Sequence, residues 1–254
     1  MKVCTVRGIH IGEGKPKVCL PIVGKNEKEI IQQFQSFQGL PYDVIELRID
    51  FYQEIRNSSS LKSVLQKLRS MTDLPILLTY RSSREGGQMQ LSDEEYQTFV
   101  KQACESQCID LIDIELMSGN TLVFQLVEIA HQNDIKVVMS NHDFDKTPCF
   151  SDMMNRLEQM EILGADICKL AVMPITYKDV ITLLNMTLEM SHKLERPIVT
   201  MAMGKIYWNI GVISRITGEL TGSSMTFASA GKISAPGQMN VIDMQVLLEA
   251  IHHD

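Results

Sequence analysis

Long apolar runs are missing from this chain of 254 residues. No stretch approaches the roughly 20 consecutive apolar residues that a membrane-spanning helix needs. Residues 1–7 also lack the long apolar core of a secretion signal. We therefore expect a protein that is neither exported nor inserted in a membrane, and that resides in the cytoplasm.

Positive charge is scarce as well. Lysine and arginine together number 24, against 31 aspartates and glutamates, which gives a net charge of −7, and no basic block interrupts the sequence. A binding surface for nucleic acid or another polyanion is therefore not expected. Individual arginines remain compatible with binding of a small anion.

Metal, dinucleotide and disulfide patterns are also lacking. The six cysteines are scattered, several of them within apolar segments, which is typical of reduced and packed thiols in a cytosolic protein. Cys104 and Cys108 have helical spacing but no partner cluster of the kind that holds zinc. No glycine fingerprint for a dinucleotide is evident. We expect neither a metal nor a cofactor.

Short apolar runs alternate with longer helix-like segments along the whole chain, a pattern typical of a parallel sheet with helical crossovers. Eight such units, with no Pro/Gly/Ser-rich linker between them, predict a single (β/α)8 TIM barrel domain over residues 1–254. Residues 3–7 precede the first unit and are expected to add a strand or hairpin at the barrel floor. The predicted barrel strands are 17–23, 44–49, 75–80, 111–116, 135–140, 166–171, 197–201 and 225–228.

Polar side chains recur at the carboxyl ends of these strands, where a barrel builds its active site. Glu46 and Arg48 share one face of the second strand, and Asp113 and Glu115 share one face of the fourth, because side chains two residues apart point the same way. Arg81 follows the third strand. Each pair alone fits a buried structural ion pair, but the agreement between five strand ends, with those of His142 and Lys169 included, favours a catalytic site at the barrel mouth.

Lys169 is unusual because its amine falls within an apolar run that predicts a buried strand. Burial disfavours the ammonium form, and a neutral amine is what attacks a ketone to form a Schiff base. His142 comes just after the preceding predicted strand, so it is expected at the same end of the sheet. Glu85 precedes two glycines that permit a tight turn, which makes it a candidate to orient His142. The plainer alternative is a lysine that reaches solvent from a strand end and a histidine on a surface loop.

Residues 229–238, after the last predicted strand, are small and polar. They predict a flexible loop that closes over a substrate, or alternatively an exposed connection without a chemical role.

The order and spacing of these motifs closely resemble type I 3-dehydroquinate dehydratase over nearly the whole length. The resemblance rests on Glu46-Leu47-Arg48, Thr79-Tyr80-Arg81, Glu85-Gly86-Gly87, Asp113-Ile114-Glu115, Ser140-Asn141-His142-Asp143-Phe144, Lys169, Ile213-Ser214-Arg215 and Ser234-Ala235-Pro236-Gly237-Gln238. It implies a TIM barrel, usually a homodimer, that needs no metal or cofactor. The implied reaction is the syn dehydration of 3-dehydroquinate to 3-dehydroshikimate in the shikimate pathway of aromatic amino acid biosynthesis.

The resemblance also implies roles for individual residues. By position, Lys169 resembles the Schiff-base lysine, His142 the proton donor and acceptor, and Glu85 the carboxylate that orients this histidine. Arg215 resembles the arginine that binds the substrate carboxylate, for which a planar two-pronged donor is well suited. The remaining substrate contacts are implied for Glu46, Arg48, Arg81, Ser234 and Gln238.

Two segments depart from the family pattern. Pro21 stands where some members have a serine that contacts substrate, so a hydroxyl and a backbone donor are lost and no contact is expected there. The stretch 203–211, which contains the only tryptophan, Trp208, is about four residues longer than the comparable loop. The insertion is interpreted as a surface elaboration or as a contact with a partner or with the substrate mouth.

Three other functions remain open from the sequence. A class I aldolase also uses a barrel lysine, although the Glu46, Arg48, Arg81 and His142 set favours a carboxylated polyol over a phosphorylated sugar. A catalytically silent barrel could serve as a binding module, and turnover of substrate would separate the two. A metal-dependent barrel hydrolase is the third, but among the six histidines only His142 lies at a strand end.

Overall fold

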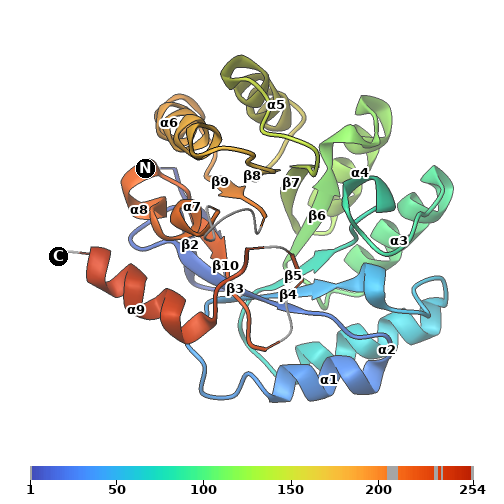
Figure 1. The fold of residues 1–254 in the computed structure, drawn as a ribbon. Helices are drawn as coiled ribbons and strands as arrows, with labels where there is room; N and C mark the ends of the chain where they lie inside the picture. The colour runs from blue at the N-terminus through green and yellow to red at the C-terminus, as the bar shows by residue number, and fades with distance from the viewer. Residues whose placement is uncertain (1, 205–210, 232–233, 236, 253–254) are drawn as a thin grey trace.

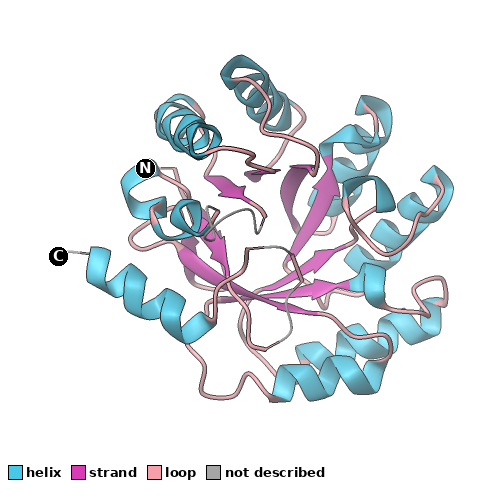
Figure 2. Ribbon diagram, viewed as in Figure 1, coloured by secondary structure: helices cyan, strands magenta, loops and turns pink. Residues whose placement is uncertain are grey.

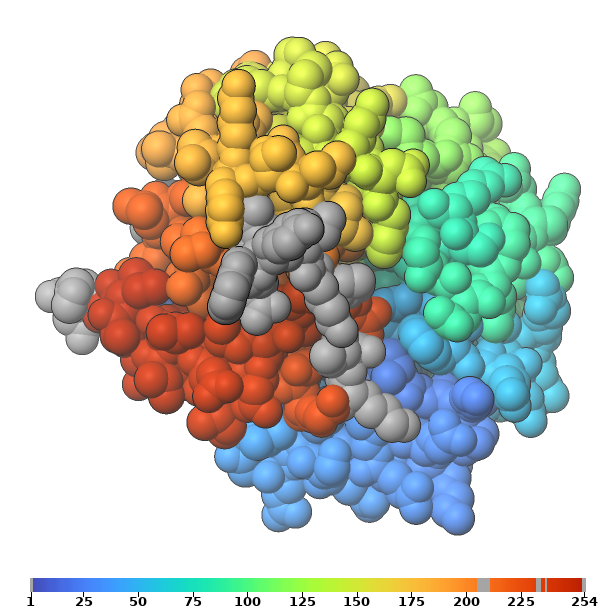
Figure 3. Space-filling view, viewed as in Figure 1, coloured from blue at the N-terminus to red at the C-terminus, as the bar shows by residue number. Residues whose placement is uncertain are grey.

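The computed structural model describes residues 2–204, 211–231, 234–235 and 237–252, and it contains a parallel eight-stranded sheet with the strand order β10-β3-β4-β5-β6-β7-β8-β9. Helices form an outer ring around these strands (Figures 1 and 2). In the space-filling view, successive units follow one another around the ring in sequence order (Figure 3). The barrel strands are β3 (Lys17–Ile22), β4 (Val44–Arg48), β5 (Ile76–Thr79), β6 (Leu111–Glu115), β7 (Lys136–Asp143), β8 (Ile167–Val172), β9 (Ile198–Ala202) and β10 (Met225–Phe227).

Each predicted apolar run overlaps one of these strands, so the predicted TIM barrel is confirmed. The barrel closes where β10 pairs with β3 and where Ile198, the first residue of β9, forms a parallel bridge with Ser223. The largest boundary difference is in β7, which continues to Asp143 because Asn141 and His142 still pair with Leu170 and Ala171 of β8.

Helices follow the strands along the chain, and capping side chains fix where several of them begin. Ser92 and Glu95 form a capping box at the start of α3, and Thr176 and Asp179 form one at the start of α6. The helices are α1 (Glu27–Gln35), α2 (Ser58–Arg69), α3 (Asp93–Glu105), α4 (Asn120–Gln132), α5 (Phe150–Ile162), α6 (Tyr177–Lys193), α7 (Val212–Ile216), α8 (Gly218–Thr221) and α9 (Val241–Ile251), with 3-10 turns η1 (Ile49–Phe51), η2 (Ser83–Glu85) and η3 (Leu116–Ser118).

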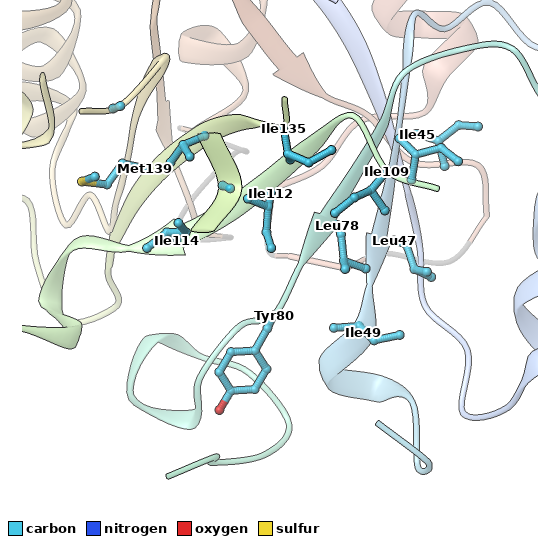
Figure 4. Close-up of a cluster of buried hydrophobic side chains, with 14 of the residues drawn as sticks. Ile45, Leu47, Ile49, Leu78, Tyr80, Ile109, Ile112, Ile114, Ile135 and Met139 are labelled. Carbon is cyan, nitrogen blue, oxygen red and sulfur yellow. The ribbon is translucent and has the colours of Figure 1, made fainter. Parts of the chain in front are cut away.

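Side chains alternate between the two faces of the barrel wall. Outward residues such as Leu47, Leu78 and Ile112 belong to the large core beneath the helices, part of which is drawn in Figure 4. Full burial of one such side chain contributes about 1.5–3 kcal/mol. A separate apolar cluster fills the lower lumen, with Val44, Leu77, Leu111, Val138, Ile167 and Met225 among its members.

The N-terminal strands β1 (Cys4–Val6) and β2 (Ile9–Ile11) pair as an antiparallel hairpin, as predicted for this extension. Cys4 and Ile11 of the hairpin pack in the lower lumen cluster. Arg7 at the hairpin turn pairs with Asp110, which immediately precedes β6, at 2.5 Å between Nε and Oδ1. The hairpin therefore closes the barrel at the amino ends of the strands, and the carboxyl ends remain for a site.

Three aspartates clamp neighbouring strands together at the barrel floor. Asp43, Asp110 and Asp166 lie one residue before β4, β6 and β8, respectively. The carboxylate of each accepts from a backbone N–H at the start of the preceding strand, at 2.7, 2.9 and 2.9 Å, respectively. In return, the backbone N–H of each aspartate donates to the carbonyl of the strand residue whose N–H its carboxylate binds. The clamps tie β3 to β4, β5 to β6 and β7 to β8.

Candidate active site

The sequence-predicted site residues converge on one cavity at the carboxyl ends of the strands. The cavity, including its open mouth, holds about 500 Å³ of space. All nine of the predicted residues line it, namely Glu46, Arg48, Arg81, Glu85, His142, Lys169, Arg215, Ser234 and Gln238.

Lys169 lies in β8 and is 4% exposed. Its Nζ is 3.2 Å from Asp113 Oδ2 and 3.9 Å from Glu46 Oε1. The face of the Phe227 ring lies on another side of the amine, with its centroid 4.4 Å from Nζ. Burial disfavours a positive charge at Nζ, but the two carboxylates and the aromatic face compensate such a charge.

Arg81 compensates the carboxylates of the site. Its Nη2 lies 2.8 Å from Asp113 Oδ2, and its Nη1 lies 2.9 Å from Glu115 Oε1 and 3.4 Å from Glu85 Oε2. Burial opposes the charge of Asp113, but Arg81 and then Lys169 outweigh it and lower the pKa of this carboxyl. Asp113 is therefore an anion around which the two cations are arranged.

His142 and Glu85 form a buried acid–base pair. His142 Nδ1 is 2.9 Å from Glu85 Oε2, and the same oxygen accepts from the His142 backbone N–H at 2.9 Å. The 3-10 turn that ends at Glu85 is followed by Gly86 in the left-handed region at φ 83°, which turns the chain back over the barrel mouth as predicted. In the barrel, β6 separates β7 from β5, so Glu85 reaches His142 from the segment after β5 (Figure 1). His142 thus lies within a strand and not on a surface loop.

The low dielectric of the site shifts the titration of both partners. Burial, followed by Arg81 and Lys169, holds the pKa of His142 well below its usual range. Burial and the nearby Glu115 raise the pKa of Glu85. The lowered pKa of His142 favours an uncharged imidazole near neutral pH, the form that accepts a proton, whereas the raised pKa of Glu85 disfavours its ionised form.

Arg48 connects the barrel wall to the loop after β10. Its Nε and Nη2 donate to the two oxygens of Asp50 at 2.8 and 3.0 Å, and its Nη1 donates to the Ser234 carbonyl at 3.3 Å. The Gln238 side chain bonds both the backbone N–H and the hydroxyl of Ser234, at 2.9 and 3.0 Å. The described part of the predicted closing loop therefore reaches the cavity, whereas residues 232, 233 and 236 lie outside the described residues.

Arg215, on the short helix α7, is 2% exposed. Its Nη1 donates to the Phe227 carbonyl at 3.4 Å and lies 3.7 Å from the Met201 sulfur. Burial lowers the pKa of this guanidinium to about 10, so it stays charged near neutral pH. The cavity therefore carries a buried cation beside an apolar wall, which suits an anionic group.

Sequence reasoning missed much of the apolar lining. The cavity also includes Gly86, Phe144, Ala171, Met201, Met203, Phe227 and Ala235. Period-two spacing could have found Ala171 from Lys169, since both face the same side of β8. Gly86 is required by packing as well as by its turn, because a Cβ there would lie 2.3 Å from the Phe144 ring.

The two departures from the family pattern have different outcomes. Pro21 is buried in β3 opposite Glu46 and is not among the residues that line the cavity. Residues 205–210 of the longer segment, including Trp208, lie outside the described residues.

The described side chains and helices also bear on metal binding and on membrane insertion. Within the described ranges, no three or more His, Cys, Asp or Glu side chains are grouped so as to hold a metal ion. Of the helices formed by described residues, none is both long and apolar enough to cross a bilayer.

The barrel and the charged cavity at its carboxyl end define a (β/α)8-barrel enzyme. The family model described as type I 3-dehydroquinase matches residues 18–254, and the chain belongs to this family. The membership predicted from the motifs is thereby confirmed, and with it the prediction of an enzyme of the hydro-lyase class.

Named relatives and solved structures agree with this assignment. The chain is 42% identical to a 3-dehydroquinate dehydratase of Listeria monocytogenes serotype 4b, over 99% of both chains. A crystal structure of the type I 3-dehydroquinate dehydratase from Clostridium difficile superposes with a TM-score of 0.94 at 43% identity, covering 99% of each chain. The 3-dehydroquinate dehydratase structure from Geobacillus kaustophilus gives a TM-score of 0.94 at 35% identity, covering 98% of this chain and 96% of the other.

Proposed function

We propose that this protein dehydrates 3-dehydroquinate to 3-dehydroshikimate in the shikimate pathway, through a Schiff base on Lys169. The family membership and the names of the relatives support the reaction. The observation that carries the mechanism is the shared cavity of the buried amine of Lys169 and the Glu85-bound imidazole of His142.

The reaction begins when Lys169 loses a proton to His142 and its neutral amine adds to the ring ketone. His142 returns the proton to the hydroxyl of this adduct, which leaves as water and gives an iminium cation, for which Asp113, Glu46 and the Phe227 ring provide compensation. The iminium withdraws electrons from the neighbouring carbon, so that a proton there becomes acidic.

His142 then moves the protons. Because Nδ1 is bound to Glu85, Nε2 is the nitrogen available to the substrate. It takes the proton from the activated carbon, which leaves an enamine, and returns a proton to the departing hydroxyl, which leaves as water. A single imidazole serves both steps, so the proton and the hydroxyl leave from the same face. Hydrolysis of the remaining imine releases the product and the lysine.

Substrate orientation is assigned to the other lining residues. Arg215 binds the carboxylate, for which its buried guanidinium offers parallel donors. Arg48 donates to both oxygens of Asp50, and Arg81 forms ion pairs with Asp113 and Glu115, so these two arginines contribute mainly by shaping the polar wall. The ring hydroxyls are assigned to Glu46, Ser234 and Gln238, with Arg48 and Arg81 contributing their remaining contacts.

The deciding experiment follows the conjugated enone of the product by ultraviolet absorbance after 3-dehydroquinate is added. Wild-type protein should generate the enone, and Lys169→Met, which keeps an unbranched side chain without the amine, should not. Lys193→Met, at an exposed ion pair on α6, is the matched control and should turn over like the wild type. A silent barrel would give no enone from any variant, which would reject the proposed activity.

We also propose that residues 1–254 act as one catalytic domain and that the enzyme is a cytoplasmic homodimer without metal or cofactor. Exposed apolar side chains on α6, α8 and α9 support self-association, with Ile181, Leu220 and Val246 at 66%, 73% and 62% exposure. Sedimentation velocity should give twice the chain mass.

Prolonged chelation should leave turnover unchanged, and activity restored only by a divalent ion would reject the metal-free mechanism.

A further inference from the structure

A chain of hydrogen bonds extends from the acid–base pair to the outside of the barrel wall. Asn141 Nδ2 donates to Glu85 Oε1 at 3.0 Å, while the other oxygen of Glu85 serves His142. Arg156, on helix α5, donates from Nη1 to Asn141 Oδ1 at 2.7 Å. Arg156 does not line the cavity, and its side chain is 22% exposed. The sequence motifs give it no role.

The donors and acceptors in this chain leave one orientation for the Asn141 amide. A guanidinium only donates, so the atom of Asn141 that faces Arg156 must be the oxygen. The amino group then faces Glu85. The reversed amide would direct its oxygen at a carboxylate oxygen and its amino group at a cation, and Asn141 is too buried, at 4% exposure, for water to relieve this.

We propose that Arg156 and Asn141 are positioning residues that favour the ionised form of the Glu85 carboxylate and thereby bias which nitrogen of His142 is free to act as a base. This inference rests on the proposed function for its kinetic consequences, although its structural part concerns the protein without substrate. Neither residue touches the reacting atoms.

The protonation state of Glu85 determines the tautomer of His142. An ionised Glu85 only accepts, so Nδ1 must carry the proton of the neutral imidazole and Nε2 is left bare. A protonated Glu85 would donate to Nδ1 and shift the ring proton to Nε2, where it blocks the basic position. Burial and Glu115 push Glu85 toward protonation, and the Asn141 hydrogen bond opposes them.

Other charged groups around the pair act in both directions. Arg81 favours the ionised form of Glu85, whereas Glu115 and Asp113 oppose it. Arg81, Lys169 and Arg48 all disfavour a positive charge on His142. Carboxylates and cations thus surround the pair. The Asn141 amide is neutral, so it favours the ionised form of Glu85 only while its amino group faces the carboxylate.

The test compares Asn141→Leu, which keeps a similar volume without a donor, with Arg156→Gln and Arg156→Lys. In Asn141→Leu, kcat should fall by about 10–100-fold, as expected for loss of one hydrogen bond to a charged group, with little change in KM. Arg156→Gln should show a smaller fall, and Arg156→Lys should recover most of it. The acidic limb of the kcat/KM profile should move to higher pH in the two impaired variants.

A double variant tests whether the two residues act in series. Asn141→Leu combined with Arg156→Gln should be no slower than Asn141→Leu alone, because Arg156 reaches Glu85 through the amide, and its other partner, Asp143 Oδ2 at 3.2 Å, does not bind Glu85. Arg69→Gln is the control, since Arg69 pairs with Asp110 at 2.8 Å at the opposite end of the barrel. It should lose stability and keep the kinetics of the wild type.

Nitrogen-15 spectra of the His142 ring, assigned by comparison with His142→Asn, read the tautomer without substrate. At a pH above the raised pKa of Glu85 the wild type should carry the proton on Nδ1, and Asn141→Leu should shift it toward Nε2. An unchanged tautomer together with unchanged kcat in Asn141→Leu, or multiplicative losses in the double variant, would overturn the inference. If the wild type fails to turn over 3-dehydroquinate, the proposed function falls, and the spectra alone decide the positioning role: a shift supports it and no shift rejects it.

Discussion

Replacing Arg215 by lysine should weaken substrate binding while leaving the fold intact. Arg215 is 2% exposed, so water cannot substitute for a missing donor. Its Nη1 already approaches the Phe227 carbonyl, and lysine offers only a point charge in place of a planar fork. Loss of one hydrogen bond to a charged partner costs about 1.5–3 kcal/mol. At 1.4 kcal/mol per tenfold, KM should rise roughly 10- to 150-fold.

The assay measures kcat and KM separately by enone absorbance, and kcat should change much less than KM because the carboxylate is bound in both the ground state and the transition state. Arg69→Lys makes the same replacement at the barrel floor and should alter stability alone. Unchanged KM in Arg215→Lys would refute the reasoning and transfer the carboxylate to Arg48 or Arg81.

Three further predictions follow from the site and the core. Borohydride added with substrate should inactivate the wild type and place the ligand mass on the Lys169 peptide. In His142→Ala an adduct should still be trapped, although turnover falls about 10²–10⁴-fold. Labelling of another lysine would contradict the mechanism. Asp113 has a lowered pKa, so its stabilising contribution is present above about pH 4, where the unfolded chain titrates, and is lost as the pH falls through the folded-state pKa. Urea unfolding should therefore show a deficit for Asp113→Asn that shrinks below pH 4; a deficit independent of pH would contradict this. A thiol reagent should label the exposed Cys149 in the native protein, while Cys104, whose pKa burial raises to about 12, should react only after unfolding; native labelling of Cys104 would disagree with the core.

The barrel could be predicted from the sequence because each strand is a nearly continuous apolar run between helix-like segments. The end of β7 could not, because Asn141, His142 and Asp143 are polar, and only pairing with β8 keeps them in a strand. Eight of the nine predicted lining residues lie in barrel strands or in the segments that directly follow them, and Arg215 lies on α7. Their order along the chain was therefore enough to predict that they meet at one end of the barrel.

Other parts of the site depend on three-dimensional closure. Met201 and Phe227 have the pattern of ordinary buried strand residues, and only the closed barrel makes them a cavity wall. Arg156 follows Asn141 by 15 residues on a helix, where a partly exposed arginine has no sequence pattern that distinguishes it. The charge balance around Lys169 likewise needs distances, since Asp113 and Glu46 belong to other strands.

The aspartate clamps at the floor bear on how the chain could be divided for engineering. Because Asp43, Asp110 and Asp166 tie strands two by two, breaks in the segments after β4, β6 or β8 would leave every clamp within one fragment. Breaks between β3 and β4, β5 and β6, or β7 and β8 would separate each aspartate from the amide that it binds. Split or permuted versions of this barrel should therefore begin and end at the boundaries between clamped pairs, where no floor aspartate is separated from the backbone amide that it binds.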